Sequence, residues 1–186
     1  MKKILIALVL LLVFGLASVY VFIPGKIKIE TTIPLRAAFP GVSRTLIDEN
    51  SWKKWWPGER PLNYDKQTYS IREKIFSVFD IDIYSANDTI NSRLELVLIK
   101  NDTMTISWHA EQVSSTNPLI RFSRYRHAKE TEENMNEILQ SMKAFLEKTK
   151  NIYGVEINRT LVKDSVLIST RRSFEHYPNV QEIDAM

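Results

Sequence analysis

The sequence has no cysteine among its 186 residues. Disulfide bonds, cysteine-linked lipid anchors, thiolate catalysis, iron–sulfur clusters and zinc–thiolate sites are therefore excluded. A glycine-rich phosphate-binding loop and a nucleophile-elbow motif are also absent, and there are only three histidines. From the sequence we therefore assign no catalytic residue, no metal ligand and no cofactor.

The chain also lacks a strong excess of either charge. It has 25 Lys and Arg against 22 Asp and Glu, and two of the lysines, Lys2 and Lys3, precede an apolar run. The remainder then has 23 against 22, a net charge of +1. Nucleic-acid-binding domains normally carry a basic patch or stripe, so we predict no nucleic-acid partner.

A long apolar segment is present at the start of the chain. Residues 4–23 are twenty consecutive residues without a charge, directly after Lys2 and Lys3. About 20 apolar residues suffice to cross the hydrocarbon core of a bilayer, so we predict a membrane as the partner of residues 4–23. A signal peptide cleaved after Gly15-Leu16-Ala17 and a buried core helix are the alternatives. The apolar core of a signal peptide spans only about 7–15 residues, which favours an uncleaved anchor.

The two lysines favour a cytoplasmic N-terminus and an exported globular part, which would be secreted or periplasmic if the segment is cleaved. We divide the chain into an anchor or signal segment (1–24), one domain (25–152) and a C-terminal piece (153–186). Residues 154–186 are too few for an independent core. They are either the start of a second domain, truncated after Met186, or a strand extension that packs on the first domain.

Periodicity predicts the elements of the central domain. Residues 26–33 alternate strictly between apolar and polar and form a half-buried strand that Pro34 ends. Residues 36–48 form a weak helix, and a second short helix capped at Asp48 carries Trp52, Trp55 and Trp56. An antiparallel meander follows. Its strands are 67–75, 77–85, 92–100 and 104–113, with one more short strand at 119–125.

The longest predicted helix, residues 129–150, has a single apolar stripe and ends before Gly154. The stripe consists of Met135, Ile138, Leu139, Met142, Phe145 and Leu146. Such a helix can cover the concave side of a curved sheet. The predicted fold class is therefore α+β, a curved antiparallel sheet wrapped on a long C-terminal helix and preceded by one transmembrane helix.

The order of these elements over residues 26–150 resembles the START-like superfamily, also called SRPBCC or polyketide cyclase-like. The closest resemblance is in the opening, where a strand ending at Pro34 precedes a helix and the run Trp52-Lys53-Lys54-Trp55-Trp56-Pro57. The tail, with Tyr153-Gly154, residues 164–168 and Tyr177-Pro178, resembles the start of a gyrase-inhibitor-like effector-binding domain. We associate this combination with bacteria of the Bacteroidetes type.

The resemblance implies a helix-grip fold, whose cavity suits an apolar ligand. Our main hypothesis is an exported, membrane-anchored domain that binds a hydrophobic or amphipathic small molecule without catalysis. Eight apolar residues face the interior if the assumed strand phases are correct, and they either line the cavity or simply fill the core. They are Ile29, Leu96, Ile106, Trp108, Met135, Ile138, Leu139 and Met142. Glu73 is in phase with Tyr69 and Ile71 and would add a buried carboxylate, unless a bulge turns it outward.

Two alternatives to this function are kept. One is a cavity-based cyclase or hydrolase that uses Glu73, Tyr84 or His109. The other is a cell-envelope interaction module that docks through the tryptophan turn or the incomplete tail. His109 and Glu111 share one strand face but lack a third metal ligand. The stretch 121–127 interleaves cations and aromatics, which beside a membrane suits anionic lipid headgroups better than RNA.

Overall fold

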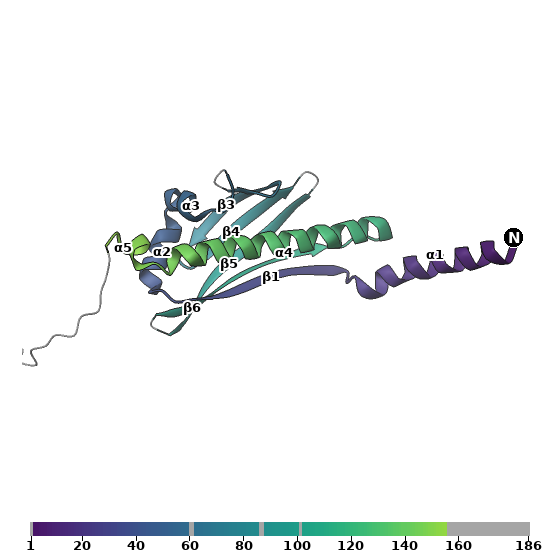
Figure 1. The fold of residues 1–186 in the computed structure, drawn as a ribbon, viewed down its shortest axis with the longest axis horizontal. Coiled ribbons are helices and arrows are strands. Elements are labelled where there is room, and N and C mark those ends of the chain that lie inside the picture. Colours follow the sequence, from purple (N-terminus) through teal and green to yellow (C-terminus); the bar gives the residue numbers. More distant parts are fainter. Residues whose placement is uncertain (1, 60–61, 86–87, 101, 156–186) are drawn as a thin grey trace, which may run out of the picture. The chain divides into compact units, whose positions relative to one another are not determined.

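A computed structural model of the chain describes residues 2–59, 62–85, 88–100 and 102–155. Its contacts divide the chain into Met1–Glu156 and Ile157–Met186. The first unit is an α+β helix grip, in which a long helix packs against one face of a curved antiparallel sheet (Figure 1). The predicted second domain or strand extension lies outside the described residues beyond Val155.

The six strands are arranged in the order β1-β6-β5-β4-β3-β2, and every neighbouring pair is antiparallel. Four of the strands form the meander that the periodicity predicts. The strand bounds are β1 Lys26–Leu35, β2 Asn63–Tyr64, β3 Gln67–Ile75, β4 Val78–Ser85, β5 Asp88–Lys100 and β6 Thr103–Val113.

Strand β1 confirms the predicted alternation, because every second residue from Ile27 to Leu35 is buried. The prediction that Pro34 ends this strand is wrong. Pro34 lies opposite Thr105 of β6, and the strand continues to Leu35. Proline is tolerated there because β1 is an edge strand, so the missing N–H does not interrupt a second ladder.

Two short helices connect β1 to the meander, as predicted. Helix α2 (Phe39–Ile47) begins with Pro40 in its first turn. Helix α3 (Glu49–Trp55) is capped by Asp48, whose side chain accepts a hydrogen bond from the Asn50 N–H at 3.0 Å. Such caps satisfy backbone donors that have no partner within the helix.

The three tryptophans of this connection are buried and contact one another. Trp52 lies 4.9 Å from Trp55 and 6.2 Å from Phe79 between ring centroids, and its Nε1 donates to the Leu46 carbonyl at 2.8 Å. Trp56 is only 7% exposed. The tryptophan turn is thus part of the core, so these rings do not form an exposed docking surface; the other docking route of the interaction-module hypothesis, the tail, lies outside the described residues.

The long helix begins earlier than predicted. Helix α4 spans Pro118–Leu146, so the predicted strand at 119–125 is wrong: those residues form its first two turns. Asn117 caps the helix by accepting from the N–H groups of Leu119 and Ile120, and Pro118 occupies the first helical position. Helix α4 ends at Leu146, and a separate helix α5 (Thr149–Tyr153) ends at Gly154, which has a left-handed φ of 74°.

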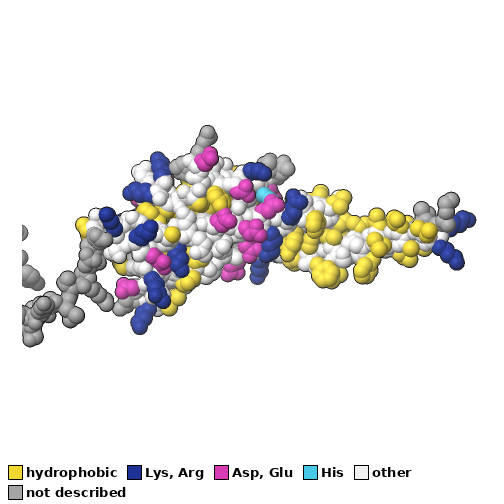
Figure 2. All heavy atoms as spheres, viewed as in Figure 1, with side chains coloured by type: hydrophobic (Ala, Val, Ile, Leu, Met, Phe, Trp, Pro, Cys, Tyr) yellow, Lys and Arg dark blue, Asp and Glu magenta, His cyan; other side chains and the backbone are white. Residues whose placement is uncertain are grey.

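Helix α1 (Lys2–Phe22) contains the predicted apolar run except its last residue, Ile23, and is long and apolar enough to cross a membrane. A signal sequence would satisfy the same criterion. The most apolar 18-residue stretch of α1 has no buried residue, so α1 is not a core helix of the described domain. Figure 2 shows apolar side chains covering this helix, whereas charged side chains are spread over the visible face of the domain.

The turn between β3 and β4 holds an aromatic residue in a strained conformation. Phe76 has a φ of 51° and is 84% exposed. A non-glycine residue in the left-handed region costs about 1–2 kcal/mol, and the exposed ring contributes little in return. We expect Phe76→Gly to raise the free energy of unfolding by about 1 kcal/mol, measured by urea unfolding. A loss of stability would mean that lost ring contacts and the greater unfolded-state entropy of glycine outweigh the relieved strain.

Candidate functional site

The eight apolar residues predicted to line a cavity all lie in the interior between the sheet and α4. Each is at most 5% exposed. Ile29 comes from β1, Leu96 from β5, and Ile106 and Trp108 from β6, and the other four, Met135, Ile138, Leu139 and Met142, come from α4. The assumed strand and helix phases are therefore correct for these eight.

Glu73 is not part of this group: of the two alternatives, an interior carboxylate or a bulge that turns it outward, the structure shows the bulge. Glu73 is exposed because the pairing of β3 with β4 shifts register between Ile71 and Glu73. Such a bulge inserts one unpaired residue and turns the following side chains to the other face. The same shift leaves Ile75 53% exposed.

The other residues of the enzyme hypothesis also lie outside the interior. Tyr84 is 43% exposed, and His109 is exposed on the sheet face that α4 does not cover. Glu73, Tyr84 and His109 therefore do not converge in a shared interior pocket. No group of three potential metal-ligating side chains occurs among the described residues, and Glu111 instead forms an ion pair with Lys26 at 2.9 Å.

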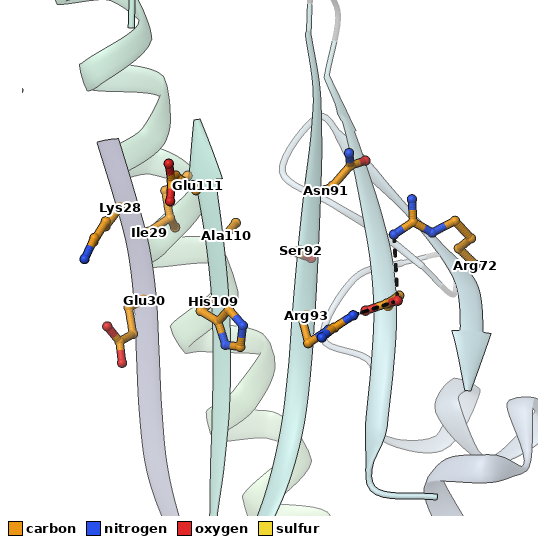
Figure 3. Close-up of a pocket in the computed structure, with 11 residues that line it drawn as sticks. Lys28, Ile29, Glu30, Arg72, Asn91, Ser92, Arg93, His109, Ala110 and Glu111 are labelled. Atoms are coloured by element: carbon orange, nitrogen blue, oxygen red, sulfur yellow. Dashed lines mark hydrogen bonds and ion pairs between the residues drawn. The ribbon is translucent and has the colours of Figure 1, made fainter. Parts of the chain in front are cut away.

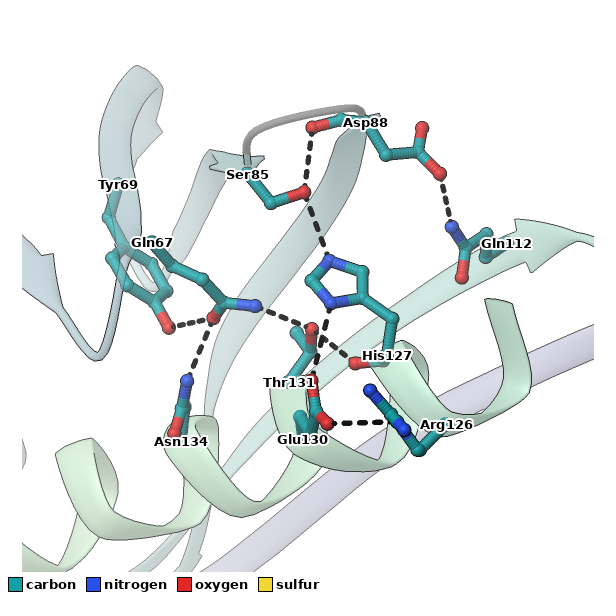
Figure 4. Close-up of polar contacts among 10 residues, drawn as sticks. All are labelled: Gln67, Tyr69, Ser85, Asp88, Gln112, Arg126, His127, Glu130, Thr131 and Asn134. Carbon is teal, nitrogen blue, oxygen red and sulfur yellow. Dashed lines mark hydrogen bonds and ion pairs between the residues drawn. The ribbon is translucent and has the colours of Figure 1, made fainter. Parts of the chain in front are cut away.

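A cluster of buried polar side chains interrupts the apolar interior (Figure 4). The amide of Gln67 on β3 is its centre. Its Oε1 accepts from the Tyr69 hydroxyl at 2.8 Å and from Asn134 Nδ2 at 3.1 Å, and its Nε2 donates to Thr131 Oγ1 at 2.8 Å. We call these four residues the polar cluster. Each is at most 7% exposed, and their mutual hydrogen bonds offset the cost of burial.

The polar cluster supplies neutral hydrogen-bonding groups and no charge. Burial is the main cause that raises the pKa of Tyr69 well above its ordinary value, with Asp65 adding to it. Its phenol therefore stays protonated and acts as a donor throughout the physiological range. Such a site can orient a polar group of a ligand, but it provides neither a general base nor a strong acid near neutral pH.

A surface pocket lies next to the polar cluster, between the end of β4, the start of β5 and the first turns of α4. Its volume is about 430 Å³, and we call it the mouth pocket. Thr131 connects the two sites by donating to the His127 carbonyl at 2.9 Å, and the His127 ring contacts Ser85 Oγ at 3.0 Å. The mouth pocket is lined by Ser85, Asp88, Ile120, Ser123, Arg124, Arg126, His127 and Glu130.

The polar cluster was not predicted from the sequence, although one signal was present. Thr131 and Asn134 fall on the same helical stripe as Met135 and Ile138, so two polar side chains interrupt an otherwise apolar face. Their partner Gln67 is more than sixty residues away in the sequence. Helical spacing can show that these side chains are buried, but it cannot show what satisfies their hydrogen bonds.

A second pocket, of about 400 Å³, lies on the opposite face of the sheet (Figure 3). Its centre is an ion-pair network in which Asp80 contacts Arg93 at 2.7 Å and Arg72 at 3.8 Å. Ile29 is the one member of the predicted lining set that borders this pocket, and none of the eight borders the mouth pocket. All eight residues belong to the buried hydrophobic core.

The Asp80 network predicts a pH dependence of stability. The hydrogen bond from Arg93 is the main cause that lowers the pKa of Asp80, with further lowering by Arg72 and His109. A lowered folded-state pKa contributes stability that is present above the unfolded pKa of about 3.9 and is lost as the pH falls through the folded value. We expect Asp80→Asn to cost about 0.5–1 kcal/mol at neutral pH and almost nothing in strong acid.

Urea unfolding at both pH values measures this difference, with Glu133→Gln on the exposed side of α4 as the control. An Asp80→Asn penalty that persists unchanged in acid would show that packing, not charge, accounts for it.

No protein-family model matches the sequence, and no curated protein matches it. Solved structures with a similar arrangement include an Aha1 dimer from Colwellia psychrerythraea, with 12% identity over 65% of this chain and 96% of that one and a TM-score of 0.47. An aromatase/cyclase called Zhui, from a Streptomyces species, has 10% identity over 66% of this chain and 94% of its own, with a TM-score of 0.42. A START superfamily protein from Mycobacterium smegmatis has 13% identity over 63% of this chain and 97% of its own, with a TM-score of 0.35. At these values the likeness carries no information about the activity of this chain.

Proposed function

We propose that the chain is a single-pass, membrane-anchored domain that binds a hydrophobic or amphipathic small molecule without catalysis. The observation that carries the proposal is the position of the polar cluster. It lies between the mouth pocket, to which Thr131 and His127 connect it, and the apolar interior that begins at Met135 and Trp108. This order of surface pocket, neutral hydrogen-bonding groups and apolar interior matches the order of groups along an amphipathic molecule.

Adaptable side chains support entry of a ligand into this buried core. Met104, Met135 and Met142 are all fully buried in the interior. Methionine is unbranched and flexible, so it can adopt new rotamers around an inserted chain at lower cost than a branched residue. The polar cluster would then exchange one of its internal hydrogen bonds for a bond to the ligand.

The assignment of α1 as a membrane anchor is supported by its exposure: its most apolar 18-residue stretch has no buried residue. The orientation rests on the sequence alone, since Lys2 and Lys3 favour a cytoplasmic N-terminus. Protease added to intact spheroplasts should degrade a tag at the C-terminus, whereas a protected tag would contradict export.

Ligand binding is tested by thermal unfolding of the full chain in lipid nanodiscs, without detergent that would compete. Added fatty acids and lysophospholipids of several chain lengths should raise the melting temperature in a concentration-dependent way. A ligand present at 100 times its Kd stabilises by about 2.7 kcal/mol. An unchanged melting temperature for every amphiphile would contradict the proposal.

The matched variants for this test are Gln67→Leu and Gln140→Leu. Gln67 is the centre of the polar cluster, whereas Gln140 is an exposed glutamine on α4. We expect Gln67→Leu to abolish the rise in melting temperature that amphiphiles with a polar head cause, and Gln140→Leu to preserve this rise. Equal shifts in both variants would place the binding elsewhere on the protein.

A further inference from the structure

The start of α4 is fixed to the end of α1 by side-chain contacts. The Tyr20 hydroxyl donates to the Thr116 carbonyl, immediately before the helix. The Arg121 guanidinium donates to the Ile23 carbonyl, through Nε at 3.0 Å, and lies 5.0 Å from the centre of the Tyr20 ring. The first turns of α4 therefore lie next to the point where the apolar run of α1 ends.

The length of α1 sets the depth of this point. Helix α1 has 21 residues, and at 1.5 Å per residue it spans about 30 Å, the thickness of the hydrocarbon core. If α1 crosses the bilayer, Ile23 lies at the boundary between hydrocarbon and headgroups. Its contact with Arg121 then places the start of α4 at the same depth.

The segment Pro118–Arg126 has the composition of a membrane-interface element, and we call it the interfacial segment. It has three arginines and no acidic residue. Its large apolar side chains are unusually exposed: Leu119 is 74% exposed, Ile120 is 47% and Phe122 is 55%. Exposed apolar groups beside cations suit the region where acyl chains meet anionic headgroups.

From these observations we propose that the interfacial segment inserts its apolar side chains into the headgroup region of the bilayer that α1 crosses. The inference rests on the proposed function, because it needs α1 to be an anchor. Its consequence is that the mouth pocket, which shares Ile120, Arg124 and Arg126 with this segment, opens at the membrane surface. An amphiphile could then pass from the bilayer to the polar cluster without crossing water.

The test uses the absence of natural cysteine, which allows one fluorescent label per single-cysteine variant of the full chain. The variants are Phe122→Cys and Leu119→Cys in the interfacial segment, Leu12→Cys in α1, and Ile99→Cys near the far end of β5. Ile99 is 65% exposed, and at about 3.3 Å per residue it lies roughly 35 Å along β5 from Asp88. Each variant is labelled with a polarity-sensitive dye and reconstituted into vesicles of phosphatidylcholine and phosphatidylglycerol.

We expect lipids with spin-labelled headgroups to quench the dye at positions 119 and 122, and aqueous iodide to quench only the dye at position 99. Replacing phosphatidylglycerol with phosphatidylcholine should weaken the lipid quenching at 119 and 122, because the arginines then lose their anionic partners. The thermal unfolding curve of each variant verifies that it is folded.

Three results would overturn the proposal. If the labels at 119 and 122 behave like the label at 99 while the label at 12 is in the bilayer, the interfacial segment does not insert, although α1 is still an anchor. A label at 12 that is also open to iodide would reject the anchor and the docking together. Protection of 119 and 122 from iodide without quenching by lipid would indicate a protein partner or a second copy of the chain.

Discussion

Replacing Trp108 with alanine is expected to lower the free energy of unfolding by about 3–5 kcal/mol, the range for a fully buried large aromatic side chain. Trp108 on β6 is 0% exposed, and its ring lies 5.8 Å from that of Tyr69. Its Nε1 donates to Ser92 Oγ at 2.9 Å, and Ser92 in turn donates to the Ile81 carbonyl at 2.6 Å. The substitution would remove the ring and leave a cavity between the sheet and α4.

Urea unfolding followed by far-UV circular dichroism measures this loss in nanodiscs. Trp108→Phe is the graded control, because it keeps one ring in the core and loses only the indole hydrogen bond and part of the volume. Tyr84→Ala, at an exposed aromatic position, is expected to cost far less. A loss below about 1 kcal/mol for Trp108→Ala would fall outside the range for a packed core aromatic and would contradict close packing of Trp108 in the interior.

The second large effect is expected at Gly58. A Cβ at this position would lie 1.9 Å from the Asn63 carbonyl oxygen, far inside van der Waals contact. The same carbonyl accepts a hydrogen bond from Trp56 Nε1 at 2.9 Å. Gly58→Ala must therefore displace backbone and disturb that bond, and we expect a loss of about 2–4 kcal/mol, from overpacking and a weakened hydrogen bond.

The matched control is Gly25→Ala, because no heavy atom lies within 4 Å of a Cβ built at Gly25. The two substitutions add the same methyl group, so their difference in urea unfolding isolates the clash with the Asn63 carbonyl. Equal and small losses for both would contradict the close approach of residues 58 and 63.

Most of the sheet could be predicted from the sequence, because the alternation of apolar and polar residues along a strand indicates directly which side chains are buried. The alternation predicted over residues 26–33 was confirmed in β1, and Asp48 marked the start of the second short helix. The sequence left two alternatives for Glu73, an interior carboxylate or a bulge that turns it outward. Periodicity alone could not decide between them, because the shift between Ile71 and Glu73 appears only in the pairing with β4.

The start of α4 was mispredicted for a different reason. Residues 119–125 mix apolar and basic side chains without a clear helical stripe, since several apolar ones are exposed. Asn117-Pro118 is a helix-start signal, which conflicts with the predicted strand at 119–125. The polar cluster needed tertiary information, because Gln67 reaches Thr131 and Asn134 only after β3 and α4 have packed together.

The central claim, that an amphipathic molecule enters the interior of the helix grip, is tested most directly by tryptophan quenching. All four tryptophans of the chain are buried, and each is at most 7% exposed. Brominated fatty acid titrated into the full chain in nanodiscs should quench their fluorescence in a saturable way. Gln67→Leu should weaken this quenching, and nanodiscs made with brominated phospholipid should quench little. Quenching that never saturates, or that is the same for brominated phospholipid, would mean that the fatty acid remains in the bilayer and would contradict the account.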